Sequence, residues 1–220
     1  MEFLPDFELN KVFLVFCFFA LMLLIQFIYA TLIYSRFAFY RSRKQKVNPD
    51  QPPVSVVIAA RNESDNLYQF LPVILNQQYP NFEVVVVNHQ SIDNSFQVLH
   101  ALRLQYPNKL KIVEVERSKH LGTGKKFPLS LGIKAAKHDY LVLTDADCEP
   151  RSALWLAKMV ERFSVKHKMV LGYAPYIKKP GLLNRIIRLD TVMIAMNYFS
   201  FAKSGMPFMG VGRNLAYTKT

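Results

Sequence analysis

An uncharged apolar run near the N-terminus restricts this chain more than any other feature of its sequence. Residues 12–34 read VFLVFCFFALMLLIQFIYATLIY, and only Gln26 and Thr31 are clearly polar. About 20 such residues cross the hydrocarbon core of a bilayer as a helix, whereas a cleaved signal peptide has an apolar core of about 7–15 residues after a positive segment. Here residues 1–11 carry three acidic side chains against Lys11. The run therefore predicts a retained transmembrane helix.

The charges that flank this run predict its orientation. Basic side chains follow it at Arg36, Arg41, Arg43, Lys44 and Lys46. The flank richer in Lys and Arg normally stays in the cytoplasm. We therefore expect an extracytoplasmic segment over residues 1–11, a single membrane span over 12–34, a basic juxtamembrane linker over 35–52 and a cytoplasmic domain over 53–220.

The chain is basic and poor in cysteine. It has 28 Lys and Arg against 16 Asp and Glu, and residues 1–46 contain only six of the basic and three of the acidic side chains. The part after the apolar run is thus basic too, which favours nucleic acid, an anionic membrane surface or a phosphorylated ligand as partner. Because Cys17 lies in the apolar run, a bridge to Cys148 is implausible. A disulfide scaffold is excluded, and we expect a reducing compartment.

Strand and helix patterns alternate after residue 53. Apolar runs predict strands at 54–60, 82–87, 110–115, 139–144 and 169–173, and helical spacing predicts a helix that includes 67–75 and helices over about 93–105, 125–137 and 153–167. Ser64 or Asp65 is the expected N-cap of the first helix, and Pro72 predicts a kink or an early boundary in it. This alternation implies a parallel sheet with helices on both faces, in which ligands bind beyond the carboxyl ends of the strands.

Residues 182–203 mix aliphatic and aromatic side chains with Arg185, Arg188 and Lys203. Two interpretations stay open for this helical stretch. As a core helix it packs against another layer of the domain. As an interfacial helix it lays its apolar face into the lipid headgroup region with the arginines outside.

The loops after the strands exclude two common phosphate-binding signatures. Arg61-Asn62-Glu63 follows the first strand without the G-x-G-x-x-G of a dinucleotide site. The loop His120-Leu-Gly-Thr-Gly-Lys-Lys126 lacks the first glycine of a P-loop and has Lys126 where Ser or Thr would bind magnesium. It is either a solvated basic turn or a loop whose amides and lysines meet phosphate oxygens at a helix start.

Two carboxylates follow the run 139–144, in the order Thr144-Asp145-Ala146-Asp147-Cys148-Glu149-Pro150. Paired carboxylates repel unless a cation offsets them, and a divalent ion that bridges to phosphate takes oxygen ligands. Alternation along an extended chain would point both carboxylates to the same side. The alternative is an Asp-rich turn that caps the next helix. Cys148 lacks the cysteine or histidine neighbours of a zinc site.

Together these segments resemble the family 2 glycosyltransferases of the GT-A fold, membrane-associated enzymes that use nucleotide-activated sugars. The resemblance covers residues 53–220 and rests on PVSVVIAARNES, FEVVVVNHQSIDNS, GTGKKFPLSLGIKAAKHDYLVLTDADCEP and GVGRNLAYTKT, in the order and spacing of the family. It implies an α/β fold with a Rossmann-like, mostly parallel sheet. It also implies transfer of a sugar from a nucleoside diphosphate to an acceptor hydroxyl, with inversion.

The resemblance further implies site residues of three kinds. The nucleotide sugar would contact Ala60, Arg61, Glu63, Asn88, Lys126, Asp145, Ala146 and Asp147, with Lys126 near the diphosphate. Asp145 and Asp147 would form the D-x-D motif, Asp147 binding Mg²⁺ or Mn²⁺, which neutralises charge on the departing diphosphate. The acceptor side would include Gly212, Arg213 and Asn214.

The sequence departs from the family in two places. Where the family commonly has Asp-Asp-Gly-Ser, this chain has Asn88-His89-Gln90-Ser91, so Asn88 would accept from a base N–H without charge assistance, and His89 is expected to be a structural donor. The family's general base, in a Glu-Asp pair, and its Q/R-x-x-R-W segment follow the motif that residues 212–217 resemble. We expect both beyond Thr220, and we expect residues 1–220 to bind donor without efficient turnover.

Two other functions stay open: a non-catalytic nucleotide-sugar-binding protein, and a basic module that binds membrane surfaces or nucleic acid. Eight basic against two acidic residues between Lys109 and Lys137 fit the second. Aromatic side chains for base stacking are nearly absent there, so nucleic acid is not an expected partner. The expected partners are a nucleotide sugar, membrane lipids and an acceptor saccharide or lipid.

Overall fold

The computed structural model describes residues 11–41, 51–117, 122, 124–164 and 167–219. They fall into two compact units, Met1–Arg43 with Tyr176–Met209, and Lys44–Pro175 with Gly210–Thr220. The predicted extracytoplasmic residues 1–10, the basic side chains Arg43, Lys44 and Lys46, and part of the loop that begins at His120 lie outside the described residues.

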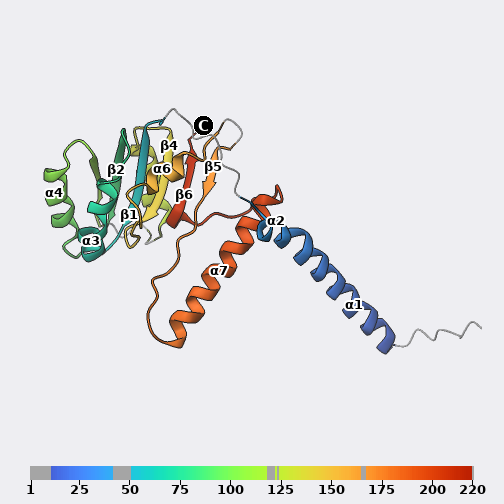
Figure 1. Ribbon diagram of the computed structural model, residues 1–220. Helices are drawn as coiled ribbons and strands as arrows, with labels where there is room; N and C mark the ends of the chain where they lie inside the picture. The colour runs from blue at the N-terminus through green and yellow to red at the C-terminus, as the bar shows by residue number, and fades with distance from the viewer. Residues whose placement is uncertain (1–10, 42–50, 118–121, 123, 165–166, 220) are drawn as a thin grey trace, which may run out of the picture. The chain divides into compact units, whose positions relative to one another are not determined.

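The first unit contains the apolar run as a helix. It consists of α1 (Lys11–Tyr29), the π-helical segment η1 (Ala30–Tyr34) and α2 (Ser35–Ala38), shown in blue in Figure 1. None of their side chains is buried. Where the helix widens, Thr31 Oγ1 donates to the carbonyl oxygens of Phe27 (2.8 Å) and Ile28 (3.1 Å). Among the described residues, Lys11–Ala38 is the one helix long and apolar enough to cross a membrane.

The predicted helix over residues 182–203 belongs to the same unit as α7 (Leu182–Lys203). Gly181 precedes it with φ 105°, a left-handed conformation that favours glycine. The side chain of Asn184 holds the preceding segment, because its Oδ1 accepts from the Lys179 N–H at 2.8 Å and its amide donates to the Ile177 carbonyl at 3.2 Å. The sequence therefore located this helix correctly.

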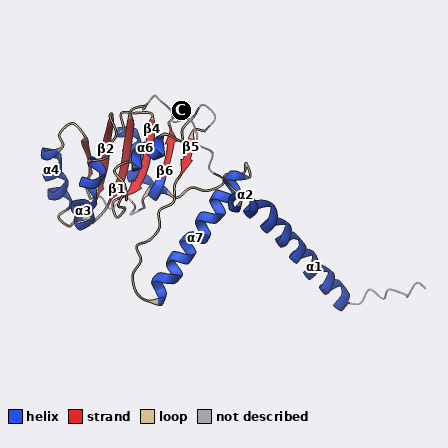
Figure 2. Ribbon diagram, viewed as in Figure 1, coloured by secondary structure: helices blue, strands red, loops and turns tan. Residues whose placement is uncertain are grey.

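The second unit is built around a sheet of six strands (Figure 2). The strands are β1 (Val54–Ala60), β2 (Phe82–His89), β3 (Leu110–Val115), β4 (Tyr140–Asp145), β5 (Met169–Leu171) and β6 (Leu215–Thr218). Their order is β3-β2-β1-β4-β6-β5, with β1 to β4 parallel and β6 antiparallel to both β4 and β5. The mostly parallel α/β sheet that the sequence predicts is confirmed.

Helices cover both faces of this sheet. They are α3 (Ser64–Leu75), α4 (Ser95–Gln105), α5 (Lys126–Ala135) and α6 (Trp155–Val160). Successive side chains of β1 point to opposite faces, so Val56 joins the core beneath α3, α4 and α6, while Val57 joins the core beneath α5. Because β1 lies between β2 and β4 and is covered on both faces, it is apolar except for the buried Ser55, whose hydroxyl donates to Glu83 Oε1 at 2.6 Å.

The predicted elements differ from the observed ones in two places. The helix expected to run to about residue 167 ends at Val160, and β6 was not predicted as a strand although it separates β4 from β5. Of the two alternatives at Pro72, a kink or an early boundary, the early boundary is absent, since α3 continues to Leu75. Proline removes one helical hydrogen bond, but the buried Leu71, Ile74 and Leu75 keep this last turn on the sheet.

The predicted N-cap of α3 is also wrong. Neither Ser64 nor Asp65 caps the helix, and Glu63 at the cap position makes no side-chain cap bond. Instead, the Ser64 N–H donates to Asp93 Oδ2 at 2.9 Å and the Glu63 N–H donates to Ser95 Oγ at 3.1 Å. The cap therefore comes from the loop after β2.

Gly132 provides a test of how α5 packs on the sheet. A Cβ at this position would lie 2.5 Å from Val57 Cγ1 and 3.0 Å from Val87 Cγ2. We expect Gly132→Ala to lower the free energy of unfolding by about 1–3 kcal/mol, as overpacked cores do. Urea unfolding of the full chain in detergent, followed by the fluorescence of Trp155, measures this. Gly124→Ala is the control, because nothing lies within 4 Å of its added Cβ; equal stability of the two variants would contradict the packing.

Candidate functional site

The register of the parallel strands gathers polar residues at one edge of the sheet. Ala60 at the end of β1 is opposite Asn88 in β2, and Ala59 is opposite Asp145 in β4. Since β6 runs antiparallel, its first residue, Leu215, is opposite Leu143 near the same edge. The helical turn η2 (Gly212–Asn214), which precedes β6, is thus delivered there as well.

A pocket of about 240 Å³ lies at this edge. It is lined by Lys125, Leu129, Leu143, Thr144, Asp145, Val211, Gly212 and Arg213. Apolar walls with a few convergent polar groups are typical of ligand sites, although those for drug-sized ligands are usually about 300–1,000 Å³. The pocket is therefore suited to one part of a ligand as large as a nucleotide sugar.

The two carboxylates of the D-x-D segment lie in a turn, not in an extended chain. β4 ends at Asp145, residues 146 and 147 form a turn, and the Cys148 N–H donates to the Asp145 carbonyl at 3.2 Å. Asp145 is half-buried and Asp147 is exposed. The expected alternation, with both carboxylates on one side of a strand, is therefore wrong.

Lys125 is the basic residue nearest to this motif. Its ammonium group donates to Asp145 Oδ1 and forms an ion pair with it. Lys125 lines the pocket, whereas Lys126, which the sequence suggested for the diphosphate, is exposed at the start of α5 and is not among the lining residues. The sequence placed both lysines in a loop that could meet phosphate oxygens, but the resemblance assigned only Lys126 to the diphosphate, because two adjacent lysines look alike until the start of the helix is known.

Hydrogen bonds join the loops after β1 and β2. The Asn62 N–H donates to Ser91 Oγ at 2.9 Å, and Asn62 Oδ1 accepts from the Ile92 N–H at 2.8 Å. Asn62 has φ 56°, a left-handed conformation that asparagine tolerates better than most residues. Although burial alone would raise it, hydrogen bonds from Ser95 and Ser64 hold the pKa of Asp93 below its usual range. Arg61 and Glu63 are half-buried beside this network.

Asn88 is bound by protein groups on both sides of its amide. Its Nδ2 donates to Glu114 Oε2 at 2.8 Å, and its Oδ1 accepts from Ser91 Oγ at 2.6 Å. The side chain is buried. The carbonyl oxygen expected to accept from a nucleobase thus already has a donor, and Asn88 orders the loop.

His89 is buried at the end of β2. Within the described part of the chain, its Nε2 has no hydrogen-bond partner. The Phe127 ring lies 5.9 Å from the imidazole, centroid to centroid. Burial first, and then the charge of Arg61, lower the pKa of His89. Because Nε2 is shielded from water, His89 is poorly placed to act as a general base.

Asn214 shapes the turn that carries Gly212 and Arg213. Its Oδ1 accepts from Trp155 Nε1 at 3.1 Å and its amide donates to the Tyr173 carbonyl at 3.1 Å. Its own carbonyl accepts from the Gly172 N–H at 2.8 Å, and a Cβ on Gly172 would lie 2.3 Å from Asn214 Nδ2. Of the three residues predicted for the acceptor side, Gly212 and Arg213 line the pocket and Asn214 supports them.

The donor atoms at this edge fit a partly coordinated divalent ion. The described residues contain no cluster of three or more His, Cys, Asp or Glu side chains that could hold a metal. Mg²⁺ is commonly bound by one or two carboxylates together with substrate phosphates and water. Asp145 and Asp147 could supply these carboxylates.

Burial, followed by the charge of Asp147, raises the pKa of the Cys148 thiol to about 11. Without a bound ion this thiol is protonated at neutral pH, and both cysteines are free thiols.

Comparison with known proteins identifies relatives of this chain. The profile of the family described as Glycosyl transferase family 2 matches residues 55–208. A poly-beta-1,6-N-acetyl-D-glucosamine synthase of Staphylococcus epidermidis is 29% identical over 114 residues, 52% of this chain and 25% of the relative. A synthase of the same name from Staphylococcus aureus strain MSSA476 is 26% identical over 190 residues, 77% of this chain and 44% of the relative. The matches thus span less than half the length of these relatives.

Among solved structures, the fold is similar to that of a mannosyltransferase from Pyrobaculum calidifontis, determined in complex with GDP-Man and Mn²⁺. The TM-score is 0.63 and the sequence identity 24%, over 88% of this chain and 53% of the mannosyltransferase. This likeness concerns the fold and confirms the GT-A architecture.

The lowered pKa of His89 predicts how stability depends on pH. Below about pH 6.5, the ordinary pKa of histidine, the unfolded chain takes up a proton that the folded chain resists, so the free energy of unfolding falls as the pH drops. We expect His89→Gln to make this decrease shallower between pH 7.5 and 5. Urea unfolding at each pH measures the free energy of unfolding of both proteins. Their difference at pH 8, where the histidine is neutral in the unfolded chain, gives the effect of the substitution on packing. Parallel pH profiles in both proteins would contradict the assignment.

Proposed function

The chain belongs to glycosyl transferase family 2, and we propose that it transfers a sugar from a nucleoside diphosphate to an acceptor hydroxyl with inversion at the anomeric carbon. The observation that carries this proposal is the convergence of Asp145, Lys125 and Arg213 on one pocket at the carboxyl edge of the sheet. Ligands of open α/β sheets bind at this edge. A pocket with two cations and a carboxylate suits a metal-bound diphosphate.

The nucleoside half of the donor would lie against the ends of β1 and β2. In this proposal it contacts Ala60, Arg61, Glu63 and Ala146. Asn88 holds the loop after β2 through Glu114 and Ser91. Because hydrogen bonds join the two loops, these residues are fixed before the donor binds. This reduces the conformational entropy lost on binding.

The diphosphate would be bound by Lys125, and Asp145 and Asp147 would hold Mg²⁺ or Mn²⁺. The ion would supply neutralisation of the charge that develops on the departing diphosphate. Lys125 would exchange its contact with Asp145 for a phosphate oxygen. Gly212 and Arg213 would face the sugar and acceptor, on a turn held by Asn214.

The membrane arrangement is part of the same proposal. Residues 12–34 would cross the bilayer, and residues 1–11 would lie outside the cytoplasm. Residues 35–52 would link the membrane helix to the domain over residues 53–220, which would lie in the cytoplasm. The support is the apolar helix, none of whose described side chains is buried, and the basic side chains Arg36 and Arg41 near its end.

Metal-dependent donor binding tests the proposed site. With the full chain in detergent, calorimetry with UDP- and GDP-sugars should show binding that requires Mn²⁺, and Asp147→Asn should weaken it at least about tenfold, the loss of one charged ligand interaction. Glu149→Gln is the matched control, because it removes an exposed carboxylate two residues away. Equal weakening in both variants would remove Asp147 from the site. Donor binding without sugar transfer to any acceptor would favour a nucleotide-sugar-binding protein instead.

The two lysines at the start of α5 provide a second test. Lys125→Ala should lower donor affinity about tenfold to a hundredfold, because charge-assisted hydrogen bonds contribute about 1.5–3 kcal/mol. Lys126→Ala should change it by less than about threefold, because weakly placed surface charges contribute little. Both variants lose one positive charge at adjacent positions, so their general electrostatic effect is the same. Equal affinities of the two variants would contradict the role given to Lys125.

A further inference from the structure

The helix unit contains a second apolar surface besides α1. We propose that α7 lies in the headgroup region of the membrane that α1 crosses, that η1 and α2 hold it there, and that anionic phospholipids cover its apolar face. This inference rests on the proposed membrane span but is independent of sugar transfer.

Four contacts attach the C-terminal half of α7 to the end of the apolar helix. Tyr34 Oη donates to Asn197 Oδ1. The rings of Phe37 and Phe199 stack with centroids 5.4 Å apart, and those of Tyr29 and Phe201 lie 5.6 Å apart. Lys203 Nζ lies 3.5 Å from the centroid of the Tyr40 ring, a cation–π contact. Figure 1 shows α7 meeting this end of the helix.

These contacts occur where the membrane boundary should fall. The 19 residues of α1 span about 28 Å at 1.5 Å per residue, close to the thickness of the hydrocarbon core, about 30 Å. Tyr29 and Tyr34 then lie at the interface, the level at which tyrosine gathers in membrane proteins. The partners of these tyrosines on α7, Phe201 and Asn197, are thereby held at the same level.

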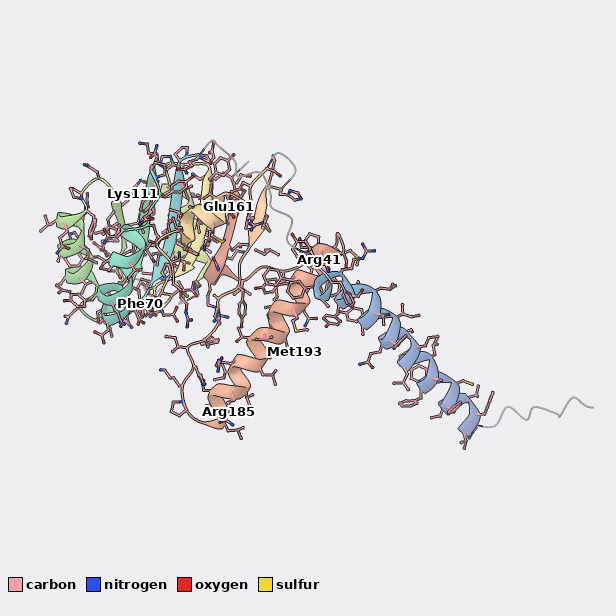
Figure 3. The ribbon with its side chains drawn as sticks, viewed as in Figure 1. Arg41, Phe70, Lys111, Glu161, Arg185 and Met193 are labelled. Carbon is pink, nitrogen blue, oxygen red and sulfur yellow. The ribbon has the colours of Figure 1, made fainter. Side chains whose placement is uncertain are left out.

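The N-terminal half of α7 presents an apolar face that the described residues leave uncovered. Leu182, Ile186, Leu189 and Met193 recur at a spacing of three and four, and 47–72% of each residue is exposed. Arg185 lies near the beginning of the helix and Met193 near its middle (Figure 3). On a helical projection Arg185 and Asp190 flank this face on either side, and Arg188 lies beyond it. An apolar stripe flanked by charges is the pattern of a helix that lies in the interface.

The charges favour lipid headgroups over a second crossing of the membrane. α7 contains Arg185, Arg188 and Asp190, which are costly at the centre of a bilayer, and Lys11–Ala38 is the described helix that meets the criteria for a span. In the interface the arginines extend from the apolar stripe to anionic phosphates while the stripe enters the acyl boundary. In this proposal the stripe of α7 and the uncovered side chains of α1 contact the same bilayer.

Spin labels measure this placement in the full chain. In vesicles of phosphatidylcholine and phosphatidylglycerol, a nitroxide at Leu189→Cys, with Cys17→Ser and Cys148→Ser, should collide more with oxygen, which concentrates in lipid, than with a water-soluble nickel chelate. A label at Arg185→Cys should show the reverse preference, with an oxygen-to-nickel ratio several-fold lower. A higher ratio at Arg185 than at Leu189, or equal ratios at both, would overturn the proposal.

One further label, on α1, separates the proposal from its premise. A nitroxide on the native Cys17, with Cys148→Ser, should report the depth of α1. If Cys17 is not in the hydrocarbon, the span itself is wrong; if it is and Leu189 faces water, α7 alone is misplaced. Dipolar broadening between labels at Leu189 would mean that a second copy of the chain covers the face, which also overturns the proposal.

The hydrogen bond between Tyr34 of η1 and Asn197 of α7 can be tested separately. Tyr34→Phe removes the hydroxyl that donates to Asn197, so the oxygen-to-nickel ratio at Leu189 should fall while that at Cys17 is unchanged. Tyr40→Phe keeps the ring beneath Lys203 and is the matched control. An unchanged ratio at Leu189 in Tyr34→Phe would show that the hydrogen bond does not hold the helix.

Discussion

Parallel pairing of β1 with β2 on one side and with β4 on the other is the constraint on which the candidate site depends. Because β1 is buried on both faces, a slip of one residue would exchange the side chains of its two cores. The register is therefore strongly specified, and it places Ala60, Asn88 and Asp145 at one edge. Antiparallel β6 then adds Gly212 and Arg213 to that edge from a distant part of the chain.

The sequence predicts the elements whose own side chains determine them. Runs rich in apolar and β-branched side chains mark the strands, so the bounds of β1 and β3 agree with the prediction, and helical periodicity does the same for α7. β6 has four residues, too few for a periodic signal, and it exists because β4 and β5 pair with it. The cap of α3 comes from Asp93 and Ser95, which lie in another loop. Such contacts between distant segments have no local signal.

The same distinction explains what the sequence says about the site. The D-x-D carboxylates and the residues of η2 could be located by their positions next to strands, but their orientation could not. The turn after Asp145 separates the two carboxylates in exposure, and Lys125 pairs with the one that is half-buried. Lys125 thus places one positive charge beside the half-buried carboxylate. A bound ion would compete with Lys125 for Asp145.

The two units are stabilised in different surroundings. The sheet unit buries its apolar side chains in two cores beneath its own helices, as a water-soluble fold does. In the helix unit, α1 buries none of its side chains, and in the proposed arrangement lipid covers them. The polar and aromatic contacts of Tyr34, Asn197, Phe37 and Phe199 join α7 to the end of this helix. If α7 lies in the interface, lipid covers its apolar stripe, as we propose for α1, and no partner protein is needed.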